Sequence, residues 1–371
     1  MAVSKLYESF EDVLSGFEKK YQLKFDRIAI AVSGGADSIA LALLLKQYSQ
    51  KYKVKLTTLT VNHHLRKEAD AEVLYVAGLM KSWGIEHHVL DWHSGNPKSG
   101  IEEKAREARY ALLLKWCLDN GYKNLMLGHH QKDQAETFIM RLQRGSGVDG
   151  LACMAEVSER EKIKLVRPLL GFSPEVLQDF LKKKKVDWVS DASNECDDFL
   201  RVRVRKILLV LEKELGLTTK RLADTAAAMG SVRAYFEIQV KKFLKASTKN
   251  WDNFAYSFSI DKLNKLHKEV KIRVLATMIR KIGAKPYPPE FEELNRLCSA
   301  LESGEFQGCT LGGCEVVVFQ ENIWIIKEVG KTKPLSQKTW EKYTQEHPRY
   351  AKVQIPYKLK INLCFAKKDP I

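Results

Sequence analysis

The 371-residue chain lacks several features that would each mark a particular class of protein. It has no apolar run long enough to span a bilayer, and residues 1–24 mix acidic and basic side chains, so we expect neither a membrane span nor a signal peptide. The Gly-x-x-x-x-Gly-Lys-Ser/Thr pattern of a Walker A loop is missing. The seven cysteines are scattered, with no Cys-x-x-Cys pair, which favours reduced thiols and a cytoplasmic protein.

Negative charge is also scarce. The chain has 61 basic and 46 acidic side chains, a formal net charge of +15, and the excess is uneven. Residues 1–215 carry 34 basic and 30 acidic side chains, whereas residues 216–371 carry 27 and 16. The surplus predicts a polyanionic partner such as a nucleic acid, bound mainly by the second half.

One short segment carries the clearest chemical signal. An apolar strand, Ile28 to Val32, runs into Ser33-Gly34-Gly35-Ala36-Asp37-Ser38 and then into an apolar helical run, Ile39 to Leu45. A strand that breaks at two glycines before a helix predicts a nest of backbone N–H groups that binds phosphate. Asp37 is placed to hold Mg²⁺ beside those phosphates. The string resembles the phosphate-binding loop of the PP-loop ATP pyrophosphatases, which cleave ATP between its α and β phosphates.

Strand-like and helix-like segments alternate through the first 215 residues, which predicts an α/β fold with a doubly wound parallel sheet. From residue 216 the pattern becomes helical, and near residue 306 it changes to a β-hairpin around Gln320. We therefore predict a catalytic domain at 1–215, a helical domain at 216–305 and a small β-containing domain at 306–371, the last two binding the polyanion.

A second polar cluster follows a predicted strand that starts at Asn124. His129 opens it, and Asp133 and Glu136 lie three residues apart on one face of the predicted helix. The two carboxylates suit either Mg²⁺ or the ammonium group of an amine substrate, and the sequence leaves that choice open. A Gly-rich segment that begins with Arg141 comes next.

Together these motifs resemble those of the tRNA(Ile)-lysidine synthetase family. The likeness covers residues 25–210 in order and continues more weakly beyond. The matching segments are Ser33–Ser38, Val61–Arg66, Ala105–Tyr110, His129–Thr137, Arg141–Leu151, Arg167–Leu169 and Asp191–Asn194. One departure is Val202, where the family usually has asparagine, and its effect is left open.

The resemblance implies that ATP first adenylates the wobble cytidine in the CAU anticodon of tRNA(Ile). Free lysine then displaces AMP, which changes the codon specificity from AUG to AUA. The implied ATP-binding residues are Ala31, Val32, Ser33, Gly34, Gly35, Ala36, Asp37, Ser38 and Val61. The implied substrate-binding residues are Arg106, Arg109, Asp133, Glu136, Arg141 and Arg144. The implied catalytic residues are Asp37, Asp133, Glu136, His129 and Arg205.

Several points remain open in the sequence. Glu136 or His129 could accept the proton that the lysine amine must lose. The oligomeric state is unreadable, although a homodimer would be common for such enzymes. The principal alternative is another PP-loop enzyme that thiolates a tRNA pyrimidine. That chemistry needs a cysteine pair or an iron–sulfur cluster, and the closest pair here, Cys309 and Cys314, lies far from the phosphate-binding loop in sequence.

Overall fold

The computed structural model describes residues 2–64, 69–92, 101–189, 200–251, 254–285, 287–304, 306, 308–328, 337–346, 355–356 and 359–360. Of residues 101–103, 339, 343 and 346 only the backbone is described. Leu65, Arg66 and residues 191–194 of the motifs above lie outside this range. The chain forms two compact units, Met1–Arg233 and Ala234–Ile371.

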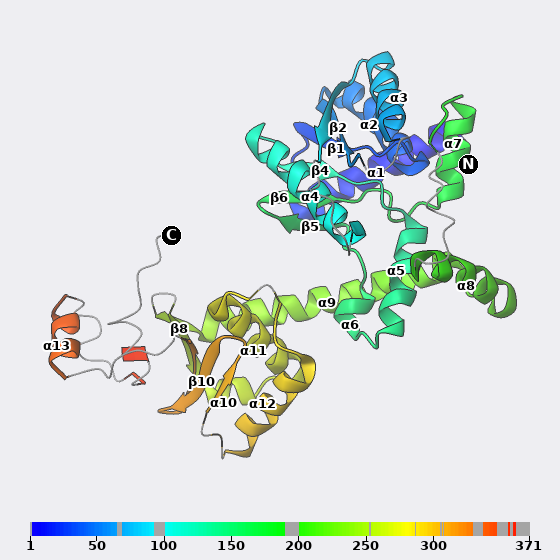
Figure 1. Ribbon diagram of the computed structural model, residues 1–371. Helices are drawn as coiled ribbons and strands as arrows, with labels where there is room; N and C mark the ends of the chain where they lie inside the picture. Colours follow the sequence, from blue (N-terminus) through cyan, green and yellow to red (C-terminus); the bar gives the residue numbers. More distant parts are fainter. Residues whose placement is uncertain are drawn as a thin grey trace. The chain divides into compact units, whose positions relative to one another are not determined.

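The first unit is built around a six-stranded sheet (Figure 1). Its strands lie in the order β3 (Glu86–Asp91), β2 (Lys55–Asn62), β1 (Arg27–Ala31), β4 (Asn124–Met126), β6 (Ile163–Val166) and β5 (Val157–Arg160). Neighbours are parallel except β5 and β6, which form an antiparallel hairpin. Because β1 lies between β2 and β4, the strand order reverses there, and such sheets bind ligands at the carboxyl ends of the strands beside that point.

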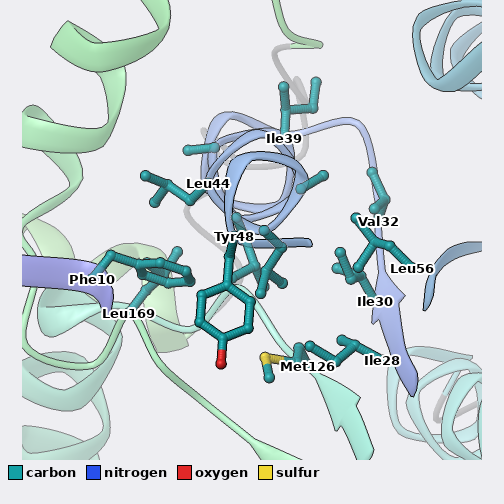
Figure 2. Close-up of a cluster of buried hydrophobic side chains, with 14 of the residues drawn as sticks. Phe10, Ile28, Ile30, Val32, Ile39, Leu44, Tyr48, Leu56, Met126 and Leu169 are labelled. Carbon is teal, nitrogen blue, oxygen red and sulfur yellow. The ribbon is translucent and has the colours of Figure 1, made fainter. Parts of the chain in front are cut away.

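Helices cover both faces of this sheet. Those of the first unit are α1 (Val3–Tyr21), α2 (Ala36–Tyr52), α3 (Ala69–Ser82), α4 (Ile101–Asp119), α5 (Gln131–Gln143), α6 (Val148–Leu151), α7 (Pro174–Lys183), α8 (Leu200–Leu215) and the start of α9 (Thr219–Ser247). Side chains alternate along β1: Ile28 and Ile30 pack with α1, α2 and α7, whereas Ala29 and Ala31 pack with α4. Figure 2 shows the first of these clusters, with Tyr48 of α2 between the strand and the helices.

A third apolar cluster joins α5 to α8 and to the first turns of α9. Its buried members are Ala135, Phe138, Val204, Leu208, Leu222 and Ala226. Val202 of α8 is also buried, so the structure accommodates an apolar side chain where the family usually has asparagine. This packing turns another face of α8 toward the polar residues of α5, which matters for the site described below.

The second unit has a five-stranded antiparallel sheet of its own. The strand order is β7 (Lys249–Trp251), β8 (Ala255–Ser259), β11 (Asn322–Lys327), β10 (Cys314–Phe319) and β9 (Cys309–Leu311). Its helices are the rest of α9, α10 (Ile260–Asn264), α11 (Lys268–Gly283), α12 (Phe291–Ser303) and α13 (Gln337–Glu346). Gly283 ends α11 against the β9–β10 turn so closely that a Cβ there would lie 2.0 Å from the carbonyl oxygen of Gly312.

The structure confirms the predicted fold class, with a mostly parallel α/β sheet, a helical segment and a carboxyl-terminal β-hairpin. The features that were not predicted include the β5–β6 hairpin and the short strands β7 and β8, which lie inside the segment predicted to be helical. The domain boundaries at 215/216 and 305/306 stay a prediction. Among the described residues, no helix is long and apolar enough to cross a membrane.

Candidate active site

The Ser33–Ser38 segment forms a tight loop between β1 and α2. The backbone N–H of Ser33 donates to Ser38 Oγ at 3.1 Å, and the Ser38 hydroxyl donates to the carbonyl of Gly35 at 2.9 Å. Gly34 has φ of +90°, and a Cβ there would lie 3.2 Å from Val76 and 3.3 Å from Val189. Only glycine fits this conformation and this close approach without strain.

The amino terminus of α2 opens directly from this loop. Its N-cap residue is Gly35, and no side chain caps the helix, so the first-turn N–H groups remain available to an anion. Asp37, in that first turn, has a buried Oδ1 to which no described residue donates a hydrogen bond. A buried carboxylate oxygen without a partner is costly unless a cation or a donor joins it, which fits the predicted metal ligand.

The second polar cluster lies beside the first because β4 approaches α2 closely. A Cβ on Gly128, just after β4, would lie 3.1 Å from the backbone nitrogen of Ser38. His130 then caps α5, in a capping box with Asp133. The His130 ring lies between two carboxylates, with Nε2 3.3 Å from Asp37 Oδ2 and Nδ1 3.6 Å from Asp133 Oδ2.

The charge of His130 follows from this position. Burial acts to lower its pKa, but the hydrogen bond to Asp37 and the negative charges of Asp133 and Glu136 outweigh burial and raise it. The His130 ring therefore links the phosphate-binding loop to α5. His130 was not among the predicted site residues.

Glu136 has an environment unlike that of Asp133. Its side chain is fully buried, and both carboxylate oxygens are occupied by arginines of α8. Arg201 Nε donates to Oε2 at 2.7 Å, and Arg205 Nε donates to Oε1 at 2.6 Å. Arg201 also approaches Asp133 Oδ1 at 3.7 Å. Glu136 thus fixes two arginines beside Asp133, a geometry that favours positioning over direct contact with substrate.

His129 is held as a neutral imidazole. Burial, together with the positive charges of Arg167, Arg109 and Arg106, lowers its pKa to about 4, although Asp133 acts in the opposite direction. Its Nδ1 is buried and has no hydrogen-bond partner among the described residues.

A cleft of about 800 Å³ opens at the carboxyl ends of β1 and β2. Most of the predicted ATP-binding residues line it, namely Ala31, Val32, Ser33, Gly35, Ala36, Asp37 and Val61. Two predicted substrate-binding residues, Arg109 and Asp133, line it as well. Gly34 and Ser38 belong to the loop but do not line the cleft. Glu136, His129 and Arg205 are not among the lining residues either.

The remaining predicted arginines lie elsewhere in the first unit. Arg106 is exposed on α4, with its guanidinium 6.0 Å from the centre of the Tyr110 ring. Arg141 and Arg144 are exposed at the end of α5, and the positive charge of Arg141 reaches Cys153. The structure therefore brings Arg109 to the cleft and leaves Arg141 and Arg144 on the surface.

Several cleft residues escaped the sequence analysis as site residues. They are Leu59, Thr60, Asn62, His63, Ala69, Glu72, Val73, Leu113, Gln178, Trp188 and Val189. Asn62 ends β2 and His63 follows it, and both belong to the quoted Val61–Arg66 motif, so their place at a strand end was a usable signal. Trp188 and Gln178 lie more than 130 residues beyond the loop in sequence, and only tertiary packing brings them to it.

Comparison with known proteins agrees with this fold. The model of the PP-loop domain family matches residues 6–212, which defines the class of the first unit. A tRNA(Ile)-lysidine synthase of Wolbachia pipientis wMel is 34% identical over 317 residues, which is 84% of this chain and 73% of that protein. One from Ruegeria pomeroyi is 36% identical over 292 residues, which is 78% of this chain and 68% of that protein. The chain belongs to the tRNA(Ile)-lysidine synthase family.

A solved structure supports the fold independently. The U34-tRNA thiolase NcsA from Methanococcus maripaludis aligns with a TM-score of 0.51 at 18% identity, covering 60% of this chain and 79% of that one. At this identity the likeness concerns the fold and not the reaction.

Proposed function

We propose that this chain ligates free lysine to carbon 2 of the wobble cytidine in the CAU anticodon of tRNA(Ile), with cleavage of ATP to AMP and pyrophosphate. The observation that carries the proposal is the cleft in which the phosphate-binding loop, Asp37, Asp133 and Arg109 meet, in a chain that belongs to this family of ATP-dependent ligases. The cytidine 2-oxo group attacks the α-phosphorus, and the lysine amine then displaces AMP.

The first step needs charge stabilisation on the leaving pyrophosphate. The uncapped N–H groups of α2 lie at the positive end of the helix dipole, and with the neighbouring Ser33 hydroxyl they are placed to stabilise that charge. Asp37 would hold Mg²⁺, which when bound adds positive charge beside the phosphates. The buried, unpartnered Asp37 Oδ1 fits that assignment. Ala31, Val32 and Val61 line the cleft at the strand ends, where we place the adenine.

The second step needs a lysine site beside the adenylated base. Asp133 lines the cleft, and we propose that its carboxylate receives an ammonium group of lysine. Glu136 is buried and holds Arg201 and Arg205, and of these Arg201 approaches Asp133 at 3.7 Å. Those two guanidinium groups, with Arg109, then offset the phosphate charge of the adenylated intermediate.

Recognition of the tRNA would come from outside the cleft. Residues 216–371 carry most of the positive excess, and we propose that they bind the RNA phosphate backbone. Arg141 and Arg144, exposed at the end of α5, would add phosphate contacts from the first unit. Because the RNA substrate is cytoplasmic, we also propose a cytoplasmic location.

Thiolation fits the site less well. Of the described residues that line the cleft, none is a cysteine. Burial raises the pKa of the Cys117 thiol to about 12 and that of Cys153 to about 11, so neither is a thiolate near neutral pH.

The test is pyrophosphate release with ATP, Mg²⁺ and a CAU-anticodon tRNA(Ile) transcript, in the chain and in Asp37→Ala. We expect release that depends on this tRNA, and we expect its loss in Asp37→Ala. The tRNA affinity should change by less than about threefold, because we place the phosphate contacts to RNA outside the loop. Release at the same rate from a methionine tRNA would contradict the proposed substrate. A large loss of tRNA affinity in Asp37→Ala would contradict the separation of the two sites.

A further inference from the structure

Two titratable side chains among the described lining residues of the cleft, His63 and Glu72, are not used in the steps above, and His63 is the one that can accept a proton as a neutral imidazole. His63 follows β2 and lines the cleft together with Val61, Asn62, Arg109 and Asp133. No described residue forms a hydrogen bond with its ring, and Nδ1 is buried without a partner. A histidine beside a substrate cleft with no structural partner has an imidazole available for chemistry.

The backbone and neighbours of His63 hold it in place. Asn62 donates from Nδ2 to Asp70 at 2.7 Å, and the N–H of His64 donates to Asn62 Oδ1 at 3.1 Å. The His63 ring meets the ring of Trp92 edge to face, with centroids 5.6 Å apart. These contacts fix the residues on both sides of His63 without occupying its nitrogens.

The charge state of His63 suits a proton acceptor. Burial, followed by the positive charge of Arg109, lowers its pKa, so the ring is neutral at pH 7. Other charged groups also line this cleft: Glu72 on α3, Asp133 on α5 and Asp37 on α2. The two carboxylates of Asp70 and Asp91 instead face His64, at 3.2 Å and 2.9 Å.

The other candidates for this role are already engaged. Glu136 is fully buried with both oxygens paired to arginines. His130 lies between Asp37 and Asp133 in a position that favours its protonated form. His129 is not among the residues that line the cleft.

We propose that His63 is the group that accepts a proton from the ε-ammonium of lysine in the second step, an assignment that rests on the function proposed above. One proton passes from the ammonium to the imidazole, and the freed lone pair forms the C–N bond to carbon 2 of the cytosine. The C–O bond to AMP breaks, and its electron pair leaves on the phosphate oxygen. The second N–H proton follows onto the released AMP, and His63 returns its proton to solvent.

The test separates the two steps in His63→Gln and His63→Asn. Adenylation is followed as pyrophosphate release without lysine, and transfer as the decay of the preformed adenylated tRNA after lysine is added. We expect adenylation within about threefold of the unmodified chain and transfer slowed about 10²- to 10³-fold at pH 7. Transfer in the variants should rise with pH as free amine accumulates. His64→Gln is the matched control, because the neighbouring ring pairs with carboxylates, and it should change transfer less than about threefold.

A second nucleophile distinguishes proton transfer from mere positioning. Hydroxylamine is largely unprotonated at pH 7 and needs no base, so its attack on the adenylated tRNA should proceed in His63→Gln at nearly the unmodified rate. Equal slowing of adenylation and transfer, or equal slowing with both nucleophiles, would overturn the assignment. Absence of adenylation in the unmodified chain would instead refute the proposed function itself.

Discussion

Glu136 and Arg205 form a short ion pair, with Arg205 Nε 2.6 Å from Oε1 of a carboxylate that has no exposed surface. The pair joins α5 to α8, and Arg201 completes it on the other oxygen at 2.7 Å. Through this pair, residues more than 60 positions apart in sequence set the polar environment of Asp133. The sequence suggested Glu136 as a ligand of substrate or metal. In the structure both of its oxygens are paired with arginines, which favours a positioning role.

Replacing Glu136 with glutamine should therefore reduce both stability and activity. The variant leaves two guanidinium groups without their buried carboxylate, and we expect the free energy of unfolding to fall by about 1–3 kcal/mol, because both arginines keep partial access to water. Urea unfolding measures the change. Glu212→Gln, on the exposed side of α8, is the control and should stay within about 0.5 kcal/mol. Equal effects of the two changes would show that the pair is not structural.

His129 should make stability depend on pH. Its pKa is about 4 in the folded chain and near 6.5 when unfolded, so the unfolded state binds more protons between these values. The contribution of the neutral His129 ring to the stability of the folded chain is fully present above pH 6.5, and it is lost as the pH falls toward 4. Between pH 7 and pH 5, we expect the free energy of unfolding of the unmodified chain to fall by about 1–2 kcal/mol more than that of the His129→Asn variant. Parallel pH profiles of unfolding for the two proteins would refute the assignment of a neutral, buried imidazole.

Gly34→Ala should damage the phosphate-binding loop. A methyl group there would be strained by the φ of +90°, and it would crowd Val76 and Val189 at 3.2 Å and 3.3 Å. We expect a loss of about 1–2 kcal/mol in stability and a raised KM for ATP. Gly78→Ala on α3 is the matched control, since nothing lies within 4 Å of its added Cβ, and it should be neutral or slightly stabilising. A normal KM for ATP in Gly34→Ala would contradict the proposed phosphate site.

Lysines of α9 should contribute to RNA binding. Reversing the charges of the exposed Lys241, Lys242 and Lys245 should weaken tRNA binding and flatten its salt dependence by about one unit of slope for each phosphate that is no longer neutralised. The KM for ATP should stay unchanged. Reversal of Lys182, Lys184 and Lys185, exposed at the end of α7, serves as the charge-matched control. An unchanged salt slope in the α9 variant would place the RNA surface elsewhere.

The sequence was most informative where function depends on backbone geometry. The two glycines of the loop, the strand before them and the apolar helix after them predict the nest, because local conformation alone creates it. The spacing of Asp133 and Glu136 predicted that both lie on one helical face. Only long-range packing decides that α8 lies over Glu136, where its arginines pair with the carboxylate. Burial of Glu136 was therefore not predictable from spacing.

The role of His63 and the strands β7 and β8 likewise depend on long-range packing and could not be predicted from local sequence. Adjacent histidines after a strand are expected to point in different directions, but only the structure tells which one lines the cleft and which pairs with carboxylates. Strands of three and five residues between long helices carry little periodic signal. They become strands because β11, more than 60 residues later, supplies the partner for β8.

The measurement that tests the account most directly is ATP-dependent incorporation of labelled lysine into a CAU-anticodon tRNA(Ile) transcript, with a methionine tRNA and a reaction without ATP as controls. The account predicts label on the isoleucine transcript alone, and only with ATP. Pyrophosphate release without lysine incorporation would contradict it, since the adenylated base would then await a different nucleophile.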